Sequence, residues 1–107
     1  MEASVDYLGG LRLGVTTRGH HRVSDQPLEN GGADTGMTPP ELLLASLGAC
    51  AGYYAAEYLR VRSLPTDGLQ IRVEAEKASK PARLSVFRIR VDVWNVDQKH
   101  QDGCFGR

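Results

Sequence analysis

Cys50 and Cys104 are the two cysteines of this 107-residue chain, and a thiol is the strongest nucleophile in it. A cysteine reacts as the thiolate, which a nearby cation favours. Cys50 lies within a long uncharged run, and its neighbours at helical spacing, Ser46, Leu47 and Tyr53, bring no cation. Activation of Cys50 therefore requires a cation from another part of the chain. The alternative is an inert buried thiol, because free cysteine packs as a small hydrophobic residue.

Arginine is the cation best suited to this task, because a guanidinium is always charged and offers several donors to an anion. Residues 11–17 alternate as in a strand, and Arg18 comes directly after them. If the alternation continues to Arg18, then Arg12 and Arg18 lie on one strand face. A solvated charged face is the simpler reading of the two arginines. Glu41 is a candidate acid, but a helix cap would account for it fully.

A metal site is not expected. His20, His21 and His100, taken with the cysteines, match no spacing of a structural zinc site. Adjacent histidines on a strand also point to opposite faces. The sequence suggests no other cofactor.

The overall composition excludes several classes of protein. Lys plus Arg and Asp plus Glu each number 13, so the net charge is zero, which argues against nucleic acid or an anionic membrane as partner. We expect no secretory signal and no membrane span, because the start lacks a basic, apolar leader and the longest uncharged run is too short. Two distant cysteines in such a chain suggest a reducing, cytoplasmic location.

One long helix is predicted over residues 38–62. Thr38 is a good N-cap, Pro39 suits the first helical position, and Glu41 completes a capping box. Pro65 and Gly68 prevent continuation. Every residue from 42 to 56 is uncharged, so we expect a helix that is buried on most sides by a sheet, a second helix or a second chain. Its glycines and alanines would let another helix approach closely.

The remaining chain is expected to form strands around that helix within a single domain, residues 1–107. Strands are predicted within residues 4–24, and the Gly-rich stretch 25–37 is a loop that could wall a site. Alternating apolar and charged residues predict a β-hairpin over residues 69–93, with its apolar side on the helix. Residues 94–107 form an irregular tail. The fold class is α+β, an antiparallel sheet packed on a long central helix.

Residues 34–50 read Asp-Thr-Gly-Met-Thr-Pro-Pro-Glu-Leu-Leu-Leu-Ala-Ser-Leu-Gly-Ala-Cys. This run closely resembles the core of the OsmC/Ohr family, and the Gly19-His20 pair, residues 25–27, Gly31-Gly32 and residues 69–75 are similar to its OsmC-like branch. The resemblance covers roughly residues 11–93. It implies an intertwined homodimer with active sites at the subunit boundary, in which a helix cysteine attacks an organic hydroperoxide.

Cys50 matches the peroxidatic cysteine of that family. The family's helper arginine comes from an N-terminal strand, for which Arg18 is the best match and Arg22 the second. The helper glutamate position holds Pro40 here, and Glu41 lies one residue later, about 100° round the helix. The chain ends before the helix that carries the family's second cysteine, and Cys104 does not resemble that residue. The sequence therefore looks truncated, and a one-cysteine cycle completed by an external thiol or lipoyl reductant is implied.

Three hypotheses follow. The first is thiol-dependent reduction of organic hydroperoxides through Cys50, with Arg18 and Glu41 as helpers, by an OsmC-like protein or a degenerate member of that group. The second is a non-catalytic dimeric module whose apolar cleft binds a small hydrophobic ligand. The third is a truncated product that folds poorly and exposes apolar helix surface.

Overall fold

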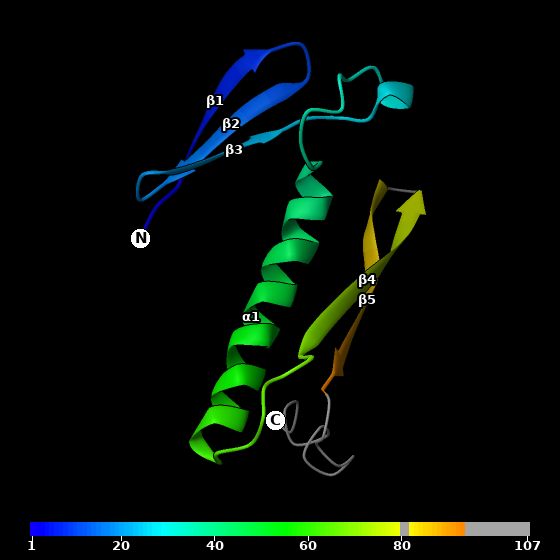
Figure 1. Cartoon of the computed structure of the whole chain (residues 1–107). Helices are drawn as coiled ribbons and strands as arrows, with labels where there is room; N and C mark the ends of the chain where they lie inside the picture. Colours follow the sequence, from blue (N-terminus) through cyan, green and yellow to red (C-terminus); the bar gives the residue numbers. More distant parts are fainter. Residues whose placement is uncertain (80–81, 94–107) are drawn as a thin grey trace. The chain divides into compact units, whose positions relative to one another are not determined.

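The N-terminal residues form a three-stranded antiparallel sheet in the order β1-β2-β3 (Figure 1). Its strands are β1 (Ser4–Gly9), β2 (Arg12–Thr17) and β3 (His20–Ser24). Two-residue turns join them, and such turns favour positive φ angles. Gly10 has φ 58°, and the second turn has φ 51° at Arg18 and 81° at Gly19. The strands expected within residues 4–24 are therefore present, with both glycine-containing turns at their junctions.

This computed structural model describes residues 1–79 and 82–93. The chain divides into two compact units, Met1–Leu43 and Leu44–Arg107. The single domain expected from the sequence stays a prediction. The predicted tail, with Cys104 and His100, lies outside the described residues.

Helix α1 (Pro39–Val61) has the ends that the sequence predicts. The Thr38 amide donates to Glu41 Oε1 at 2.8 Å, and the Glu41 amide donates to Thr38 Oγ1 at 3.3 Å, which is a capping box. At the other end Ser63 has φ 54°, and the Leu64 amide donates to the Leu59 carbonyl at 2.9 Å. A left-handed residue with this backbone bond closes a helix in a Schellman motif.

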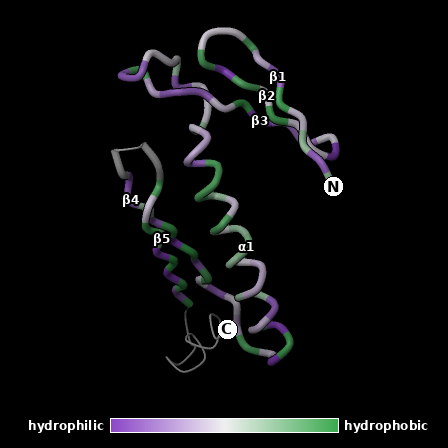
Figure 2. The backbone as a smooth tube through the Cα atoms, turned by 180° about the vertical axis from the view of Figure 1, so that it is seen from behind, coloured by the Kyte–Doolittle hydropathy of each residue, from purple (hydrophilic) through white to green (hydrophobic). Residues whose placement is uncertain are grey.

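Strands β4 (Gln70–Ser79) and β5 (Ala82–Asp92) form the expected antiparallel hairpin. Apolar residues face each other across it, because Ile71 pairs with Val91 and Val73 pairs with Ile89. Charged residues occupy the opposite face, and in Figure 2 hydrophilic and hydrophobic segments alternate along β5. An Arg88–Glu76 ion pair of 2.7 Å bridges the two strands on the charged face.

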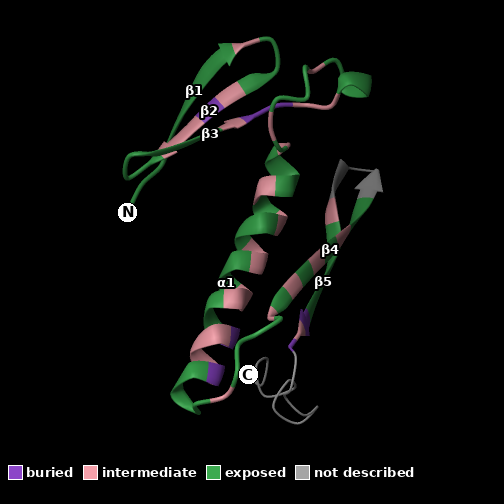
Figure 3. Ribbon diagram, in the orientation of Figure 1, coloured by how far each residue is buried: buried purple, intermediate pink, exposed green. Residues whose placement is uncertain are grey.

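The core of this unit sits where the C-terminal half of α1 meets the hairpin. Ala55 and Leu59 of α1 are buried with Val91 and Val93, and Ile71 packs against them. Figure 3 shows the buried positions of this unit gathered at that end of α1 and of β5. The core therefore fixes the helix to the hairpin at one end of both elements.

Two of the small residues of α1 make room for a strand, and the close approach of another helix stays a prediction. A Cβ atom built on Gly48 would lie 3.2 Å from Val73 Cγ2, and one on Gly52 would lie 3.3 Å from Ile71 Cγ1. The two glycines lie one helical turn apart and so share a face. Within the described residues, their missing side chains make room for β4.

The expectation of a helix buried on most sides is not met by the isolated chain. Ala55 and Leu59 are the buried residues of α1, whereas Cys50 is exposed and Tyr53 and Tyr54 are 64% and 61% exposed. A two-stranded hairpin covers one face of a helix, and this helix is apolar on more than one. The remaining apolar face is open to solvent in the chain as described.

Candidate functional site

Cys50 lies near the middle of α1 and carries a free, exposed thiol. Helical residues advance by about 100° each, so Cys50 points about 200° away from Gly48. Because Gly48 is the residue on which β4 rests, the Cys50 side chain lies on the face of α1 that is turned away from the hairpin. The thiol is thus accessible and is not sealed by apolar side chains of its own unit.

Aromatic residues follow Cys50 on the same side of the helix. Tyr54 is one turn beyond Cys50, and its ring meets that of Tyr53 edge to face, with centroids 5.3 Å apart and planes at 78°. Val61, three turns beyond Cys50, is 62% exposed. We call Cys50, Tyr53, Tyr54 and Val61 the thiol face of α1. Its side chains are mostly apolar or aromatic, but Glu57, two turns beyond Cys50, places a charged group on the same stripe.

Arg18 does not occupy the strand position that we predicted for it. It lies in the two-residue turn between β2 and β3, with φ 51°, and is exposed. The alternation of residues 11–17 ends at Thr17, which pairs with His20, so Arg18 is not on a strand face with Arg12. The physical reason is the turn itself, which requires two residues outside the ladder.

Arg22, the second candidate, does lie in a strand. It pairs with Val15 in the sheet, is exposed, and its guanidinium donates to the carbonyl of the adjacent His21 at 2.8 Å. Arg22 therefore lies in a strand and Arg18 in a turn, and the choice between them as the partner of Cys50 stays a prediction. Both belong to the Met1–Leu43 unit whereas Cys50 belongs to the other, and a partnership with Cys50 therefore stays a prediction.

Glu41 is held by the capping box and is exposed. Its carboxylate accepts from the Thr38 amide, so the structure gives it the capping role that the sequence indicated. Glu57, seven residues after Cys50, forms an ion pair with Arg60 through bonds of 2.7 and 3.1 Å. The hydrogen bond from Arg60 lowers the pKa of Glu57. Glu57 is thus paired with a cation of its own helix.

Asp25 organises the long loop, a role that the sequence reading missed. It is 1% exposed, and its Oδ2 accepts from the Thr35 hydroxyl at 2.7 Å, the Thr35 amide at 3.1 Å and the Ala33 amide at 3.3 Å. Its Oδ1 accepts from the Gln26 amide at 2.7 Å. The bonds from Thr35, above all, lower the pKa of Asp25 to about 2. The position of this aspartate just before a Gly-rich loop is the sequence signal that could have indicated its role in the loop.

The loop that we expected as a site wall is therefore shaped around its own carboxylate. The 3₁₀ turn η1 (Leu28–Asn30) lies within it, and the Gly32 amide donates to the Pro27 carbonyl at 3.1 Å. A Cβ on Gly32 would overlap the Gln26 carbonyl, and one on Gly36 would overlap that of Val23. These close backbone approaches explain why glycine stands at both positions.

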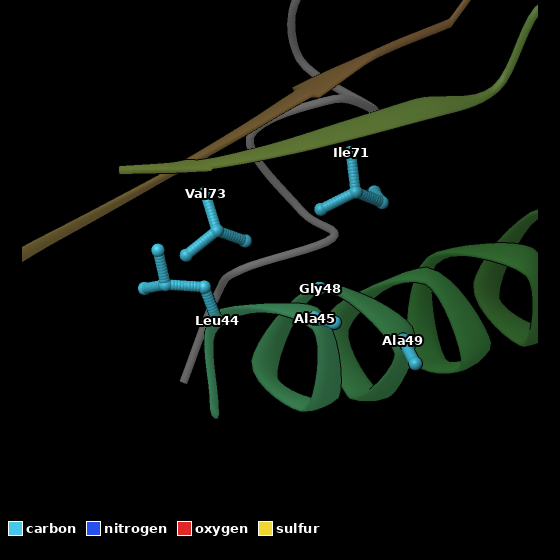
Figure 4. A pocket seen from close by; sticks show the side chains of 6 residues that line it. All are labelled: Leu44, Ala45, Gly48, Ala49, Ile71 and Val73. Carbon is cyan, nitrogen blue, oxygen red and sulfur yellow. The ribbon is translucent and has the colours of Figure 1, made fainter. Parts of the chain in front are cut away.

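An open pocket of about 370 Å³, whose lining side chains are apolar, lies between α1 and β4 (Figure 4). The helix contributes Leu44, Ala45, Gly48 and Ala49, and the strand contributes Ile71 and Val73. In Figure 4 the side chains of Leu44, Ile71 and Val73 project into the space between the two elements. Cys50 does not line this pocket.

No helix within the described residues has the length and apolar character needed to cross a membrane. Among residues 1–79 and 82–93, no three His, Cys, Asp or Glu residues gather as a metal site would require.

Comparison with known families decides the affiliation of the chain. The family described as OsmC-like protein matches residues 31–102, about two thirds of the sequence. The chain belongs to the OsmC-like family. The matched region contains Cys50, Glu41 and the hairpin, whereas Arg18 and Arg22 precede it.

Solved structures share the fold of this OsmC-like chain. An osmotic stress induced and detoxification response protein from Psychrobacter arcticus 273-4 has a TM-score of 0.85 and 24% identity, over 96% of this chain and 77% of the other. An organic hydroperoxide resistance protein OsmC from Legionella pneumophila has a TM-score of 0.65 and 19% identity, over 97% and 79%. At these identities the likeness establishes the α+β fold alone. No curated protein matches the chain.

Proposed function

We propose that this OsmC-like protein reduces organic hydroperoxides through Cys50, as a cytoplasmic homodimer. The observation that carries the proposal is a free, exposed thiol on the helix that the family match covers. Reactive cysteines need access to substrate, and an inert core cysteine would be buried. The family is associated with hydroperoxide resistance through relatives such as the Legionella pneumophila protein.

The proposed chemistry begins with attack of the Cys50 thiolate on the terminal peroxide oxygen. The sulfur–oxygen bond forms as the O–O bond breaks, the alkoxide leaves and takes a proton, and Cys50 becomes a sulfenic acid. An external thiol or lipoyl dithiol then condenses with the sulfenic acid, releasing water, and a second thiol reduces the resulting disulfide. Peroxide is reduced to alcohol and the external thiols are oxidised to a disulfide.

A guanidinium from Arg22 or Arg18 is proposed to favour the thiolate and to bind the charge that develops on the leaving oxygen. Replacing the acting arginine by glutamine is expected to slow Cys50 oxidation about a hundredfold. The other arginine serves as the matched control, because its replacement should leave the rate unchanged. If both variants oxidised Cys50 at the rate of the unaltered protein, arginine assistance would be excluded.

Glu41 enters the proposal as a helper that also caps α1. A Glu41→Gln variant keeps a side-chain oxygen for the Thr38 amide and removes the charge, whereas Glu41→Ala removes both. A slower reaction in Glu41→Gln with unchanged thermal stability would support a catalytic charge. A loss of stability in Glu41→Ala, with full activity in Glu41→Gln, would leave capping as its sole role.

The decisive experiment is the rate of sulfenic-acid formation at Cys50 with cumene hydroperoxide and with hydrogen peroxide. Cys50→Ser is the blank. We expect a rate well above that of a free thiol, with preference for the organic peroxide. A rate no better than that of a free thiol would rule out the enzyme. Sedimentation of the same sample tests the homodimer.

The second candidate function is a non-catalytic dimeric module that binds a small hydrophobic ligand. The pocket between α1 and β4 favours it, because its lining side chains are all apolar. A sealed Cys50 would have favoured it further, but the thiol is exposed in the described chain. Ligand binding by a protein with an unreactive Cys50 would establish this function over the first.

A further inference from the structure

We propose that the Tyr53–Tyr54 pair makes Cys50 selective for hydroperoxides that carry an aromatic ring on the carbon next to the O–OH group. This inference rests on the proposed reduction of organic hydroperoxides and names its substrate class. Tyr54 is the specificity-determining residue, because its ring contacts that of the substrate, and Tyr53 is a positioning residue that acts through Tyr54. All three residues belong to α1, so the helix itself sets their relative placement.

Helix α1 places both tyrosines beside the thiol. Tyr53 and Tyr54 follow Cys50 by three and four residues. Residues at these spacings are neighbours on a helix surface, with about 5–6 Å between their Cβ atoms. Helical side chains lean toward the N-terminus, so each covers the surface of the turn before its own position. A molecule that reaches the Cys50 sulfur from the C-terminal side of the helix therefore meets these rings.

The two rings are exposed and can accept a third. Tyr53 is 64% exposed and Tyr54 is 61% exposed. Their rings meet edge to face, with centroids 5.3 Å apart and planes at 78°. That contact leaves other ring faces free, and a further edge-to-face or offset contact with an aromatic ring is favourable. Neither ring belongs to the core that α1 forms with the hairpin.

The proposed reaction brings a substituent of the substrate to the position of Tyr54. The Cys50 sulfur attacks the terminal oxygen, the S–O bond forms as the O–O bond breaks, and the alkoxide leaves and takes a proton. The carbon that bears the substituents follows the second oxygen, so a phenyl group on that carbon lies about one helical turn from the sulfur. Tyr54 is one turn from Cys50, and the phenyl group can therefore lie against its ring during the attack.

The far end of this aromatic surface favours a single ring over a long chain. Glu57 follows Cys50 by seven residues on the same stripe, and its carboxylate is paired with Arg60 at 2.7 Å. An alkyl chain that continued past Tyr54 along the helix would lie against this ion pair and displace its water without compensation. A phenyl group ends before it. The surface therefore fits an aryl hydroperoxide better than a long-chain one.

The test compares cumene hydroperoxide with tert-butyl hydroperoxide, which has a methyl group in place of the phenyl group. The readout is the rate of sulfenic-acid formation at Cys50 in the full chain, divided by the rate of free cysteine with the same peroxide. This division removes the intrinsic reactivity of each peroxide. We expect the corrected rate to be about tenfold higher for cumene hydroperoxide, because a ring is buried against a ring.

Two outcomes separate this inference from the proposed function. Equal corrected rates for the two peroxides, both well above that of free cysteine, would overturn the aromatic preference and leave peroxide reduction standing. Rates no better than that of free cysteine with either peroxide would overturn both.

Substitutions on the thiol face assign the preference to its residue. Tyr54→Leu keeps an apolar side chain without the ring and should slow the reaction with cumene hydroperoxide far more than that with tert-butyl hydroperoxide. Tyr54→Phe keeps the ring and should retain the preference, whereas Tyr53→Leu should lower it in part. Val61→Ala, three turns beyond Cys50, is the matched control and should leave both rates unchanged. A preference that survives Tyr54→Leu, or that falls equally in Val61→Ala, would overturn the assignment, with circular dichroism confirming the helix in each variant.

Discussion

The loop of residues 25–37 encloses one carboxylate, that of Asp25, whereas helix α1 leaves much of its apolar surface open to solvent. In the loop, Asp25 accepts four hydrogen bonds, and the backbone passes so close to itself that glycine is required at 32 and 36. In the helix, Cys50 and its aromatic neighbours have no cover in the described chain. The carboxylate of Asp25 is satisfied within the loop, whereas the apolar surface of α1 remains uncovered.

We therefore expect function on helix α1 rather than in the loop of residues 25–37. The buried carboxylate of the loop is engaged by four donors of the loop itself, although the length of the loop first suggested a site wall. The exposed thiol of Cys50, by contrast, takes no part in the packing of α1 on the hairpin. Each of the following changes tests that contrast between the two regions.

The largest effect is expected for Gly36→Ala. Its Cβ would overlap the Val23 carbonyl, which is backbone and cannot move aside as a side chain does. We expect a loss of about 3 kcal/mol in the free energy of unfolding, measured with urea, or failure to fold. An unchanged urea midpoint would contradict the close approach of the backbone in this loop.

The next effect concerns acid stability through Asp25. Its pKa is about 2 in the folded chain and ordinarily near 3.8, so the unfolded chain binds the proton more readily. The stability that Asp25 provides is therefore complete above about pH 4 and is lost as the pH falls toward 2.

Asp25→Asn should lower the urea midpoint at pH 6 and flatten its decline between pH 4 and 2. The urea midpoint should fall at pH 6 because the NH2 group that the substitution introduces would stand where a carboxylate oxygen of Asp25 accepts hydrogen bonds, facing donors that it cannot satisfy. Asp34→Asn, an exposed neighbour in the same loop, is the control. An Asp25→Asn protein with the full acid decline would assign that decline to other carboxyl groups.

A smaller loss is expected at the start of α1. Thr38→Ala removes the hydroxyl that accepts from the Glu41 amide and should cost about 1 kcal/mol. Thr38→Ser keeps the hydroxyl and should retain the stability. Equal thermal midpoints for the two variants would show that the capping box contributes nothing measurable.

The smallest effect is expected for Gly52→Ala in α1. Its Cβ would lie 3.3 Å from Ile71 Cγ1, so that side chain would have to shift by a few tenths of an ångström. A gain of about 1 kcal/mol in helix propensity offsets that crowding, so the net change in unfolding free energy should stay within about 0.5 kcal/mol. A loss as large as that of Gly36→Ala would mean that β4 cannot move away from the helix.

Local signals in the sequence predicted the elements well. The Thr38–Glu41 capping box, the hairpin of residues 69–93 and the N-terminal strands follow from short-range rules, and each is found. The error at Arg18 came from extending strand alternation by one residue into a turn. Because alternation and turn geometry meet at that residue, the pattern alone did not show which applied.

The site residues were less predictable. Cys50 was identified by its chemistry and by the family motif, but its exposure depends on what packs on α1. Asp25 was not recognised because its four donors include Ala33 and Thr35, eight and ten residues later in a loop without periodicity. Contacts of that kind leave no regular spacing in a sequence.

The sequence by itself determined the helix, its caps, the strands and the family, because these depend on neighbours within a few residues. Only the tertiary structure decided which face of α1 meets β4, and hence that Gly48 turns toward the strand while Cys50 turns away from it. A helix that is apolar all round gives no sign of its preferred side. That choice depends on the shapes of Val73 and Ile71, which fit where a glycine leaves room.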